Sequence, residues 1–564
     1  MKKRLIVIGG VAAGLKAAAK ARRCDPEIEI VVYQEEEDIS YAGCGLPYYI
    51  SGLVKKREDL ISQTPGKFAV EGIKIRVQRR IESIDTEKRT VAGRYVGAEG
   101  GFTDHFDRLV LATGARPIRP KIEGMELGNI FYLRSIADAD EILERIQSEA
   151  IRNVVIAGGG HIGMEMAESL VHLGKTVTIV EMAPQIVTLF DEDFAWILRQ
   201  YLEKQGVQIY TSERIKALKG NGGKVTHVQT ASREIKADAV LMSLGIRPSI
   251  ELAKEAGLRI GETGAIWVDE RMETSVKGVF AAGDCAETTH LVTGKKAWVP
   301  LGSTANKQGR VVGINACGGN AIFPGVMGTA VFKAFDFSVA KTGLSMKEAH
   351  REGLHPIQAI VRGYAQAEYY PGEKESALKV IADKGSGRIL GGQAVGNGPS
   401  DKFIDTLAMA LHTRMTCQAL ASVDLAYAPP FSPPLSPVIV AASVLMNKLE
   451  GKLKGIEASE VGERLRTSGE SFQLLDVREE EEVKEKRIPG SVWIPLRELK
   501  GRLQALDKNR EIVVHCESGL RSYKACLKLE YEGFGNVKNI DGGLLCWGDN
   551  LESETAEGSD SKHK

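Results

Sequence analysis

The 564-residue sequence predicts a multidomain α/β protein, and two observations carry that prediction. Residues 5–33 read as strand, glycine-rich turn, helix and strand, and residues 154–180 repeat the pattern. Each repeat is followed later by an apolar run that ends in glycine, at residues 109–114 and 239–245. Strands that alternate with helices predict parallel sheets. The repeated unit is the main internal repeat of the chain.

Composition narrows the class of protein. Apolar residues make up 43% of the chain and charged residues 26%, as in ordinary globular proteins. The 74 basic and 74 acidic residues leave no net charge, so we expect neither nucleic acid nor a membrane surface as a partner. The eight cysteines lack metal-ligand spacing, and no apolar stretch is long enough to span a bilayer. We therefore expect no metal site and a reducing, cytoplasmic environment.

The turn Gly9–Gly14 lies between a β-branched strand and an alanine-rich helix. Such a turn presents backbone N–H groups at a helix N-terminus, where a pyrophosphate binds. Val11 replaces the middle glycine of the usual pattern, and the ribose-binding position holds Gln34, beside Glu35, in place of an acidic residue. Because Gln34 can still hydrogen-bond a ribose hydroxyl, we interpret the turn as a dinucleotide site.

The turn Gly158–Gly163 matches the full pattern, and Glu181 ends the next strand at the ribose-binding position. A carboxylate there accepts a hydrogen bond from a 2′-hydroxyl and repels a 2′-phosphate, so we predict NADH rather than NADPH. A later turn, Gly283-Asp284, ends a strand, and its carboxylate can accept from ribityl hydroxyls. This turn favours FAD in the first site and implies that the FAD domain resumes after the NAD domain.

The motifs at Gly9, Thr113-Gly114, Gly158 and Gly283-Asp284 resemble those of the pyridine nucleotide–disulfide oxidoreductase family over residues 1–445. The resemblance implies two Rossmann-like domains for FAD and NAD, then an α+β dimerisation domain. The expected boundaries are 1–117 and 246–325 for the two parts of the FAD domain, 118–245 for the NAD domain, 326–445 for the dimerisation domain and 446–458 for a linker. The residues expected to bind the two cofactors are Gly9, Gly10, Ala12, Ala13, Gly14, Gln34, Glu35, Thr113, Gly114, Arg134, Gly158, Gly160, Ile162, Gly163, Glu181, Gly245, Gly283 and Asp284.

Cys44 is the candidate redox thiol. Glutathione-reductase-like members of the family carry a CxxxxC pair, whereas the residue five positions after Cys44 is Tyr49. Without a local partner, Cys44 must form any disulfide with a substrate. The sequence places it at the start of a helix, where the dipole is expected to lower the pKa of the thiol.

The segment around Cys44 is similar to that of coenzyme A-disulfide reductases and NADH-dependent persulfide reductases. That resemblance implies coenzyme A as substrate or bound ligand. The matching positions are Lys20, Arg23, Ser40, Tyr41, Lys67 and Asn306. It also implies two catalytic tyrosines that reach over from the other subunit of a homodimer, which match Tyr427 and Tyr369, with Tyr370 as an alternative to the latter. A phenol can give a proton to a departing thiolate.

Four ordered motifs near the C-terminus resemble a rhodanese and imply an α/β domain over 459–552, followed by a disordered tail over 553–564. They are Leu474–Arg478, Arg487–Leu496, Ile512–Ser522 and Asp541–Gly543. Cys516 ends a strand and starts a loop before a helix, so successive N–H groups form a cradle for a thiolate or persulfide. Gly519 permits this tight path, and Arg521 adds positive charge. We assign Cys516 and Arg521 to catalysis.

These features predict a flavoprotein of sulfur metabolism. It would use NADH and FAD to reduce persulfides, polysulfides or coenzyme A disulfide through Cys44, and Cys516 would relay sulfane sulfur to that site. One alternative is an NADH oxidase or peroxidase that works through a Cys44 sulfenate. A second is a redox-sensing or sulfur-carrier module without turnover of its own.

Overall fold

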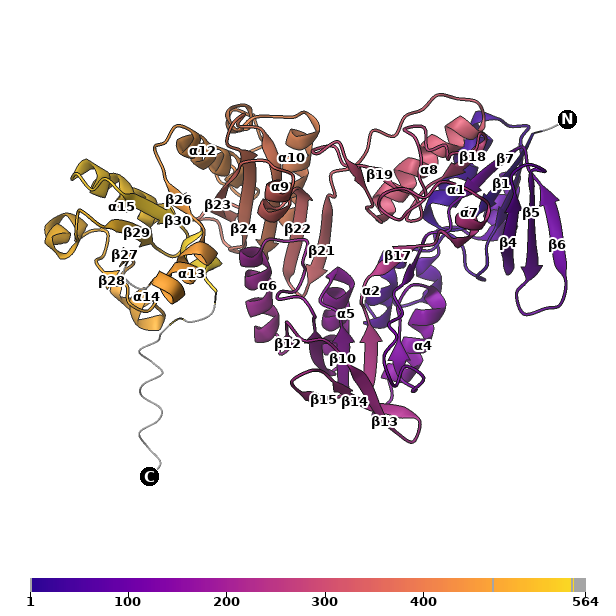
Figure 1. Ribbon diagram of the computed structural model, residues 1–564, viewed down its shortest axis with the longest axis horizontal. Helices are drawn as coiled ribbons and strands as arrows, with labels where there is room; N and C mark the ends of the chain where they lie inside the picture. Colours follow the sequence, from indigo (N-terminus) through magenta and orange to yellow (C-terminus); the bar gives the residue numbers. More distant parts are fainter. Residues whose placement is uncertain (1–2, 469–470, 549–550, 552–564) are drawn as a thin grey trace. The chain divides into compact units, whose positions relative to one another are not determined.

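The computed structural model describes residues 3–468, 471–548 and 551. Its chain divides into two compact units, residues 1–186 with 206–328 and residues 187–205 with 329–564. Figure 1 shows the course of the chain through the helices and strands. Within the described residues, no helix combines the length and apolar character needed to cross a bilayer. The predicted tail, 553–564, lies outside the described residues.

The first glycine-rich turn belongs to a five-stranded parallel sheet of order β18-β7-β1-β2-β3. Strand β18 comes from beyond the second βαβ unit, so the first domain resumes late in the chain. The elements of this domain and its antiparallel additions are β1 (Arg4–Ile8), α1 (Ala12–Cys24), β2 (Glu29–Tyr33), η1 (Gly43–Gly45), α2 (Leu46–Ile50), η2 (Arg57–Leu60), α3 (Pro65–Val70), β3 (Ile73–Arg76), β4 (Arg79–Asp85), β5 (Thr90–Tyr95), β6 (Gly101–His105), β7 (Arg108–Leu111), β8 (Ala115–Pro117), β17 (Ile246–Pro248), α7 (Glu251–Glu255), β18 (Val279–Ala281), β19 (Thr288–Thr289), β20 (Lys296–Ala297) and α8 (Gly302–Ala316).

Close packing of helices α1 and α8 holds this first turn in place. A Cβ on Gly309 would lie 2.4 Å from the Ala13 carbonyl oxygen, and one on Gly313 would lie 2.5 Å from that of Ala17. Because real side chains do not make such contacts, two glycines one helical turn apart let the backbones touch. The N-terminal end of α1 is thereby fixed over its own sheet, in which β1, β2, β7 and β18 are almost wholly buried.

The second glycine-rich turn belongs to another parallel sheet, of order β12-β11-β10-β16-β9. A three-stranded antiparallel sheet, β13-β14-β15, follows β12. The elements are β9 (Ile130–Phe131), α4 (Ile136–Ile146), β10 (Asn153–Ala157), α5 (His161–His172), β11 (Thr176–Val180), β12 (Gln208–Tyr210), β13 (Ala217–Asn221), β14 (Lys224–Gln229), β15 (Glu234–Lys236) and β16 (Ala239–Met242).

The next domain is a five-stranded antiparallel sheet, β21-β22-β25-β24-β23, with four helices after it or between its strands. The mixed α+β character agrees with the predicted dimerisation domain. The elements are β21 (Ala330–Ala334), β22 (Phe337–Gly343), α9 (Met346–Arg351), β23 (Pro356–Tyr364), β24 (Glu375–Asp383), β25 (Ile389–Gly396), α10 (Ser400–His412), α11 (Cys417–Ala421) and α12 (Pro437–Leu449).

Helix α6 (Glu192–Lys204) departs from the expected boundaries, because it groups with the antiparallel sheet rather than with residues 118–245. Its attachment is a buried charge cluster. Lys379, from β24, is 1% exposed and donates to Asp191 at 3.1 Å and to Asp193 at 2.7 Å. The ring of Tyr201 also stacks on Phe337 with centroids 3.6 Å apart. Sequence periodicity carries no signal for such a long-range pairing.

The C-terminal domain is a third parallel sheet, of order β26-β30-β29-β27-β28. Its elements are β26 (Gly455–Ile456), α13 (Ala458–Ser468), β27 (Phe472–Asp476), α14 (Glu480–Glu485), β28 (Val492–Trp493), η3 (Leu499–Ala505), β29 (Glu511–His515), α15 (Leu520–Tyr531), β30 (Val537–Ile540) and η4 (Gly543–Cys546). The fold class is therefore the predicted one: two Rossmann-like domains, an α+β domain and a C-terminal α/β domain.

The segment 446–458, expected to be a linker, is largely built into the flanking domains. Helix α12 continues to Leu449, and β26 joins the C-terminal sheet by pairing with β30. At this junction Lys448 donates at 2.6 Å both to the Gln358 carbonyl of β23 and to the Asp541 carboxylate of the C-terminal domain. Lysines suggested a solvated linker, but the Lys448 side chain is only 8% exposed.

Candidate active sites

The first glycine turn is shaped for close approach of a ligand to the backbone. Gly9 has a φ of +112°, and a Cβ there would lie 2.1 Å from the Ala112 carbonyl oxygen. A Cβ on Gly14 would lie 1.9 Å from the Gly9 carbonyl oxygen. The Gln34 side chain accepts a hydrogen bond from the Gly10 N–H at 2.7 Å, whereas Glu35 pairs with Arg80 at 3.2 Å. The turn thus fits a pyrophosphate at the N-terminus of α1, with Gln34 at the ribose side.

The second glycine turn repeats this geometry. Gly158 has a φ of +108°, and a Cβ there would lie 2.2 Å from the Ser243 carbonyl oxygen. Glu181 accepts from the Gly159 N–H at 2.6 Å and from the Ala183 N–H at 2.7 Å. The Glu181 carboxylate thus occupies the position that Gln34 has in the first turn, at the end of the second strand. The donor set fits a second dinucleotide.

Arg134, Thr113 and Asp284 lie at the carboxyl edge of the first sheet. The Thr113 hydroxyl donates to the Ser249 carbonyl oxygen at 2.7 Å, and Arg134 donates to the Ala115 carbonyl oxygen at 2.6 Å. Burial raises the pKa of Asp284, and the Arg134 guanidinium opposes that shift. Gly114, Gly245 and Gly283, which were also predicted to bind the cofactors, have φ between +68° and +93°, a conformation that favours glycine.

Glu36 is a residue that the sequence interpretation missed. Its carboxylate accepts from Arg134 at 2.7 Å, from the Tyr41 hydroxyl at 3.1 Å and from Gln34 at 3.2 Å. It therefore ties the first glycine turn to the segment that leads to Cys44. The acidic run after the strand was the available signal, but a run of carboxylates at a strand end is also typical of a solvated surface.

Cys44 lies in the single turn η1, directly before the short helix α2. The prediction that a helix N-terminus lowers the pKa of this thiol is wrong for the protein alone. Cys44 is exposed, yet the surrounding protein atoms desolvate its sulfur and raise the pKa, and the carboxylates of Glu165 and Asp284 add to the increase. The helix has only five residues, so its dipole is short.

Glu165 and Tyr48 form a hydrogen-bonded pair near the Cys44 thiol. The Tyr48 hydroxyl donates to Glu165 at 3.2 Å, and Ser169, on the same helix α5, donates to the Pro47 carbonyl oxygen at 2.9 Å. Burial raises the pKa of Glu165 to about 7, and the neighbouring Glu168 adds to that shift. A carboxyl that titrates near neutrality can take up or release a proton close to Cys44. The sequence interpretation did not identify this pair.

The residues matched to coenzyme A contacts differ in whether their side chains are exposed and free of other hydrogen bonds. Arg23 and Lys67 are exposed, and Lys20 is half-buried on α1. Tyr41 is buried with its hydroxyl on Glu36, so its phenol is already engaged. The remaining two are Ser40, which has a φ of +52°, and Asn306, whose amide donates to the Gly302 carbonyl oxygen at 2.9 Å.

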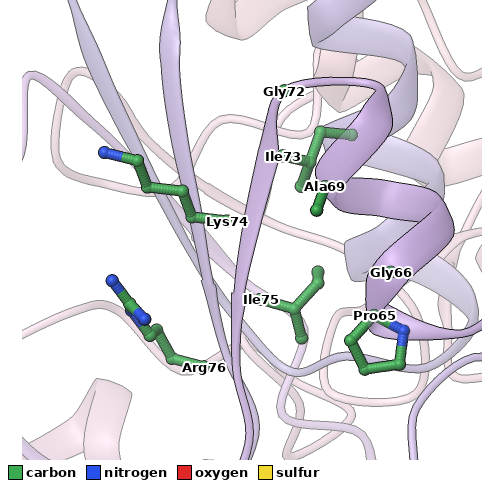
Figure 2. Close-up of a pocket in the computed structure, with 8 residues that line it drawn as sticks. All are labelled: Pro65, Gly66, Ala69, Gly72, Ile73, Lys74, Ile75 and Arg76. Carbon is green, nitrogen blue, oxygen red and sulfur yellow. The ribbon is translucent and has the colours of Figure 1, made fainter.

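A surface hollow lies between helix α3 and strand β3 (Figure 2). Figure 2 shows the Ile73 and Ile75 side chains toward the helix, and Lys74 and Arg76 on the other side of the strand. None of the residues matched to coenzyme A lines this hollow. It therefore adds nothing to the coenzyme A assignment.

The matched tyrosines are on the surface of the second unit. Tyr369 is 77% exposed, Tyr427 is 51% exposed and Tyr370 is 40% exposed. Phe431 and Leu435, which follow Tyr427, are also exposed. Large exposed apolar side chains on one domain are typical of a surface that another protein covers.

The Cys516 loop joins strand β29 to helix α15. The Cys516 sulfur, 1% exposed, accepts from the Gly519 N–H at 3.1 Å and from the Ser522 hydroxyl at 3.4 Å. Gly519, with a φ of +102°, caps the helix in the left-handed conformation. The Arg521 guanidinium also interacts electrostatically with the Cys516 sulfur, and it is held by Glu482. The loop is a cradle of donors around one sulfur atom.

The folds and the two glycine turns define a dinucleotide-dependent oxidoreductase with an attached sulfur-handling domain. Residues 3–309 match the family described as pyridine nucleotide-disulphide oxidoreductase, residues 329–437 match its dimerisation domain, and residues 457–550 match the rhodanese-like domain. The chain therefore belongs to the pyridine nucleotide-disulphide oxidoreductase family and carries a rhodanese-like domain.

Three relatives illustrate the similarity. The NAD(P)H coenzyme A polysulfide/persulfide reductase of Pyrococcus horikoshii is 41% identical over 77% of this chain and 96% of its own length. An NADH oxidase of Methanocaldococcus jannaschii is 37% identical over 76% of this chain and 95% of its own length. The structure of an NAD-dependent persulfide reductase from A. fulgidus has a TM-score of 0.91 and 42% identity, and it covers 96% of this chain and 100% of that one.

Proposed function

We propose that the protein is an NADH-dependent flavoprotein that reduces low-molecular-weight persulfides, polysulfides or coenzyme A disulfide through Cys44, with sulfane sulfur delivered by Cys516. The observation that carries the proposal is the presence in one chain of two separate thiol sites. One is a single exposed cysteine at the carboxyl edge of the first Rossmann-like sheet, and the other is a buried cysteine in a cradle of donors. Similarity to an NAD-dependent persulfide reductase over 96% of the chain supports it.

The cofactor sites are assigned to the two glycine turns. Gly9 to Gly14 with Gln34 would hold FAD, and Gly158 to Gly163 with Glu181 would hold NADH. When bound, NADH and FAD supply two electrons to the site beside Cys44, because the redox chemistry belongs to the cofactors. The chain itself orients them through backbone donors and through the carboxylate or amide at the end of each second strand.

Cys44 performs the sulfur chemistry as a thiolate. It attacks the inner sulfur of coenzyme A persulfide, the S–S bond breaks, and the outer sulfur leaves as hydrosulfide. With coenzyme A disulfide the leaving group is the coenzyme A thiolate. Both routes give a Cys44–coenzyme A mixed disulfide, which two electrons and a proton split into free coenzyme A and the Cys44 thiolate.

Proton management falls to Glu165 and its neighbours. A carboxyl with a pKa of about 7 can accept the proton that Cys44 loses and return one later. The two carboxylates that raise the pKa of Cys44 also make its thiolate a stronger nucleophile once it forms. Tyr369 or Tyr370, and Tyr427, would protonate the leaving thiolate from the partner subunit of a homodimer. The matched dimerisation domain and the exposure of these phenols support that arrangement.

Coenzyme A would be held by basic side chains on α1, namely Lys20 and Arg23. Lys67, Asn306 and Ser40 are further contacts in this proposal. Tyr41 is better assigned to positioning the Cys44 segment, because its hydroxyl bonds Glu36. A cytoplasmic location is also proposed, since all eight cysteines are free thiols, as expected in a reducing compartment.

The test is anaerobic NADH oxidation by the purified protein with coenzyme A persulfide, polysulfide, coenzyme A disulfide and hydrogen peroxide compared side by side, with sulfide quantified. We expect turnover with a sulfur substrate, loss of that turnover in Cys44→Ser and retention in Cys24→Ser, a matched control at an exposed cysteine. Fast turnover with peroxide alone would instead favour the NADH oxidase or peroxidase function that the M. jannaschii relative suggests. Bound FAD without turnover on any acceptor would favour a sensor or carrier.

A further inference from the structure

The charges around the Cys516 loop are balanced in a way that bears on its sulfur donor. Arg521 donates through both terminal nitrogens to Glu482, at 2.5 and 2.6 Å. Lys486 donates to Glu517 at 3.0 Å. Each of these two cations beside the loop therefore has a carboxylate partner.

The third cation, Arg478, belongs to the core of the domain. It is fully buried and donates to the Asp476 carboxylate at 2.8 Å, and one of its nitrogens lies 3.7 Å from Glu517. Glu517 is the residue directly after Cys516, so a negative charge is built into the loop itself. Asp476, Glu482 and Glu517 together match these three cations charge for charge, and a fourth cation that acts on Glu517, Arg362, is paired with Glu375.

An anion can therefore bind only to the donors around the Cys516 sulfur. The Gly519 N–H and the Ser522 hydroxyl donate to the Cys516 sulfur, and the Arg521 guanidinium interacts with it electrostatically. These donors suit one negative charge on that sulfur, as a thiolate or a persulfide. A second and third negative charge from a donor would meet the Glu482 and Glu517 carboxylates, while each cation named above already has a carboxylate partner.

Sulfane-sulfur donors differ in this respect. Thiosulfate carries two negative charges on the small group that enters the loop and releases sulfite, whereas the reacting –S–SH group of a persulfide carries at most one and releases a thiolate. We propose that Cys516 is loaded by a persulfide of a low-molecular-weight thiol, and that Glu482 and Glu517 exclude thiosulfate by neutralising the Arg521 and Lys486 cations at the loop. This inference rests on the proposed function, whose sulfur donor it specifies.

The transfer balances without an added oxidant or reductant. The Cys516 thiolate attacks the outer sulfur of the persulfide R–S–SH, and the S–S bond of the persulfide breaks. The electron pair leaves on the thiolate RS⁻, and the outer sulfur with its proton becomes the Cys516 persulfide. A coenzyme A thiolate can then take the same sulfur by the reverse kind of attack.

The test measures loading of Cys516 in the full-length protein, anaerobically and without NADH, as the gain of one sulfur atom in intact mass. Glutathione persulfide and thiosulfate are the two donors, and Cys516→Ser supplies the background. We expect the wild type to load from glutathione persulfide at least about tenfold faster than from thiosulfate, the effect of roughly one uncompensated charge near the donor.

Two near-isosteric variants each remove the carboxylate partner of one basic side chain at the loop. Glu482→Gln frees Arg521, and Glu517→Gln frees Lys486, so each is expected to raise the thiosulfate-to-persulfide rate ratio by about tenfold. Glu480→Gln is the matched control on the same helix α14, because Glu480 is half-exposed and pairs with Lys484. Its ratio should equal that of the wild type.

The outcomes separate the two levels of the proposal. Equal loading of the wild type by both donors, or ratios in both variants that match the control, would overturn the inference while leaving the relay intact. Failure of both donors to load Cys516 in the wild type would overturn the relay itself. A raised ratio in either folded variant supports the assignment even where the other variant does not fold.

Discussion

Replacement of Lys448 by methionine should loosen the C-terminal domain from the antiparallel sheet. Lys448 and Asp541 are 2.6 Å apart, and each side chain is 8% exposed. Breaking a buried pair from one side typically costs about 3–5 kcal/mol, because the remaining charge stays buried. The Gln358 carbonyl also loses its donor, at about 1 kcal/mol.

Protonation of Asp541 limits that cost. Burial already raises the pKa of Asp541, and loss of the ammonium that opposes this shift raises it further. The variant is therefore destabilised above the pKa of the folded carboxyl, and the defect shrinks as the pH falls through it. We expect about 3 kcal/mol near neutral pH, which is roughly a hundredfold in the opening equilibrium.

The assay is cleavage by thermolysin at neutral pH. This protease cuts before apolar residues, and Leu453 and Ile456, at the junction, are 6% and 3% exposed, so cutting requires opening. Lys452→Gln is the matched control, because Lys452 is 65% exposed and pairs with Glu450 on the surface, and glutamine adds no apolar cleavage site. We expect Lys448→Met to be cut at the junction roughly a hundredfold faster than the control. Equal cleavage rates in the two variants would refute the claim that this pair holds the junction closed.

Two further predictions concern the reductase half. Glu165→Gln removes a carboxylate that raises the pKa of Cys44, so iodoacetamide should alkylate Cys44 faster at pH 7 than in the wild type. Glu144→Gln, at an exposed position, should leave the alkylation rate unchanged. Slower alkylation of Glu165→Gln would contradict the conclusion that Glu165 raises the pKa of Cys44. Glu181→Ala removes the carboxylate at the ribose position, and kcat/KM for NADH should fall about tenfold or more while that for NADPH does not fall, since a hydrogen bond to a charged group contributes about 1.5–3 kcal/mol. Parallel losses for both cofactors would show that Glu181 only supports the turn through Gly159.

Local patterns predicted the architecture because glycines and strands act over short distances. Gly9 and Gly158 stand where any Cβ would strike a carbonyl oxygen, so the turn is encoded at one position. The Cys516 loop is likewise local, as the donors on Gly519 and Ser522 lie within six residues of the sulfur.

Features that join distant segments escaped prediction. Glu165 lies 117 residues from its partner Tyr48, and Lys379 lies 186 residues from Asp193. Neither pairing leaves a periodic signal, and the run of glutamates around Glu482 does not indicate which of them pairs with Arg521. The pKa of Cys44 was predicted with the wrong sign because the protein desolvates its sulfur, and because the carboxylates of Glu165 and Asp284 come from distant segments of the chain.

Cys44 and Cys516 are proposed to serve one reaction, and sulfide release with limiting coenzyme A is the first measurement to make. Glutathione persulfide would supply the sulfur, NADH would be the reductant, and sulfide and NADH would be followed anaerobically in wild type and Cys516→Ser. We expect the wild type to release one sulfide for each NADH oxidised, and Cys516→Ser to release sulfide slowly. Cys516→Ser should turn over added coenzyme A persulfide at the normal rate, which would show that its defect lies in sulfur delivery. Unchanged release by Cys516→Ser from glutathione persulfide would contradict this proposal.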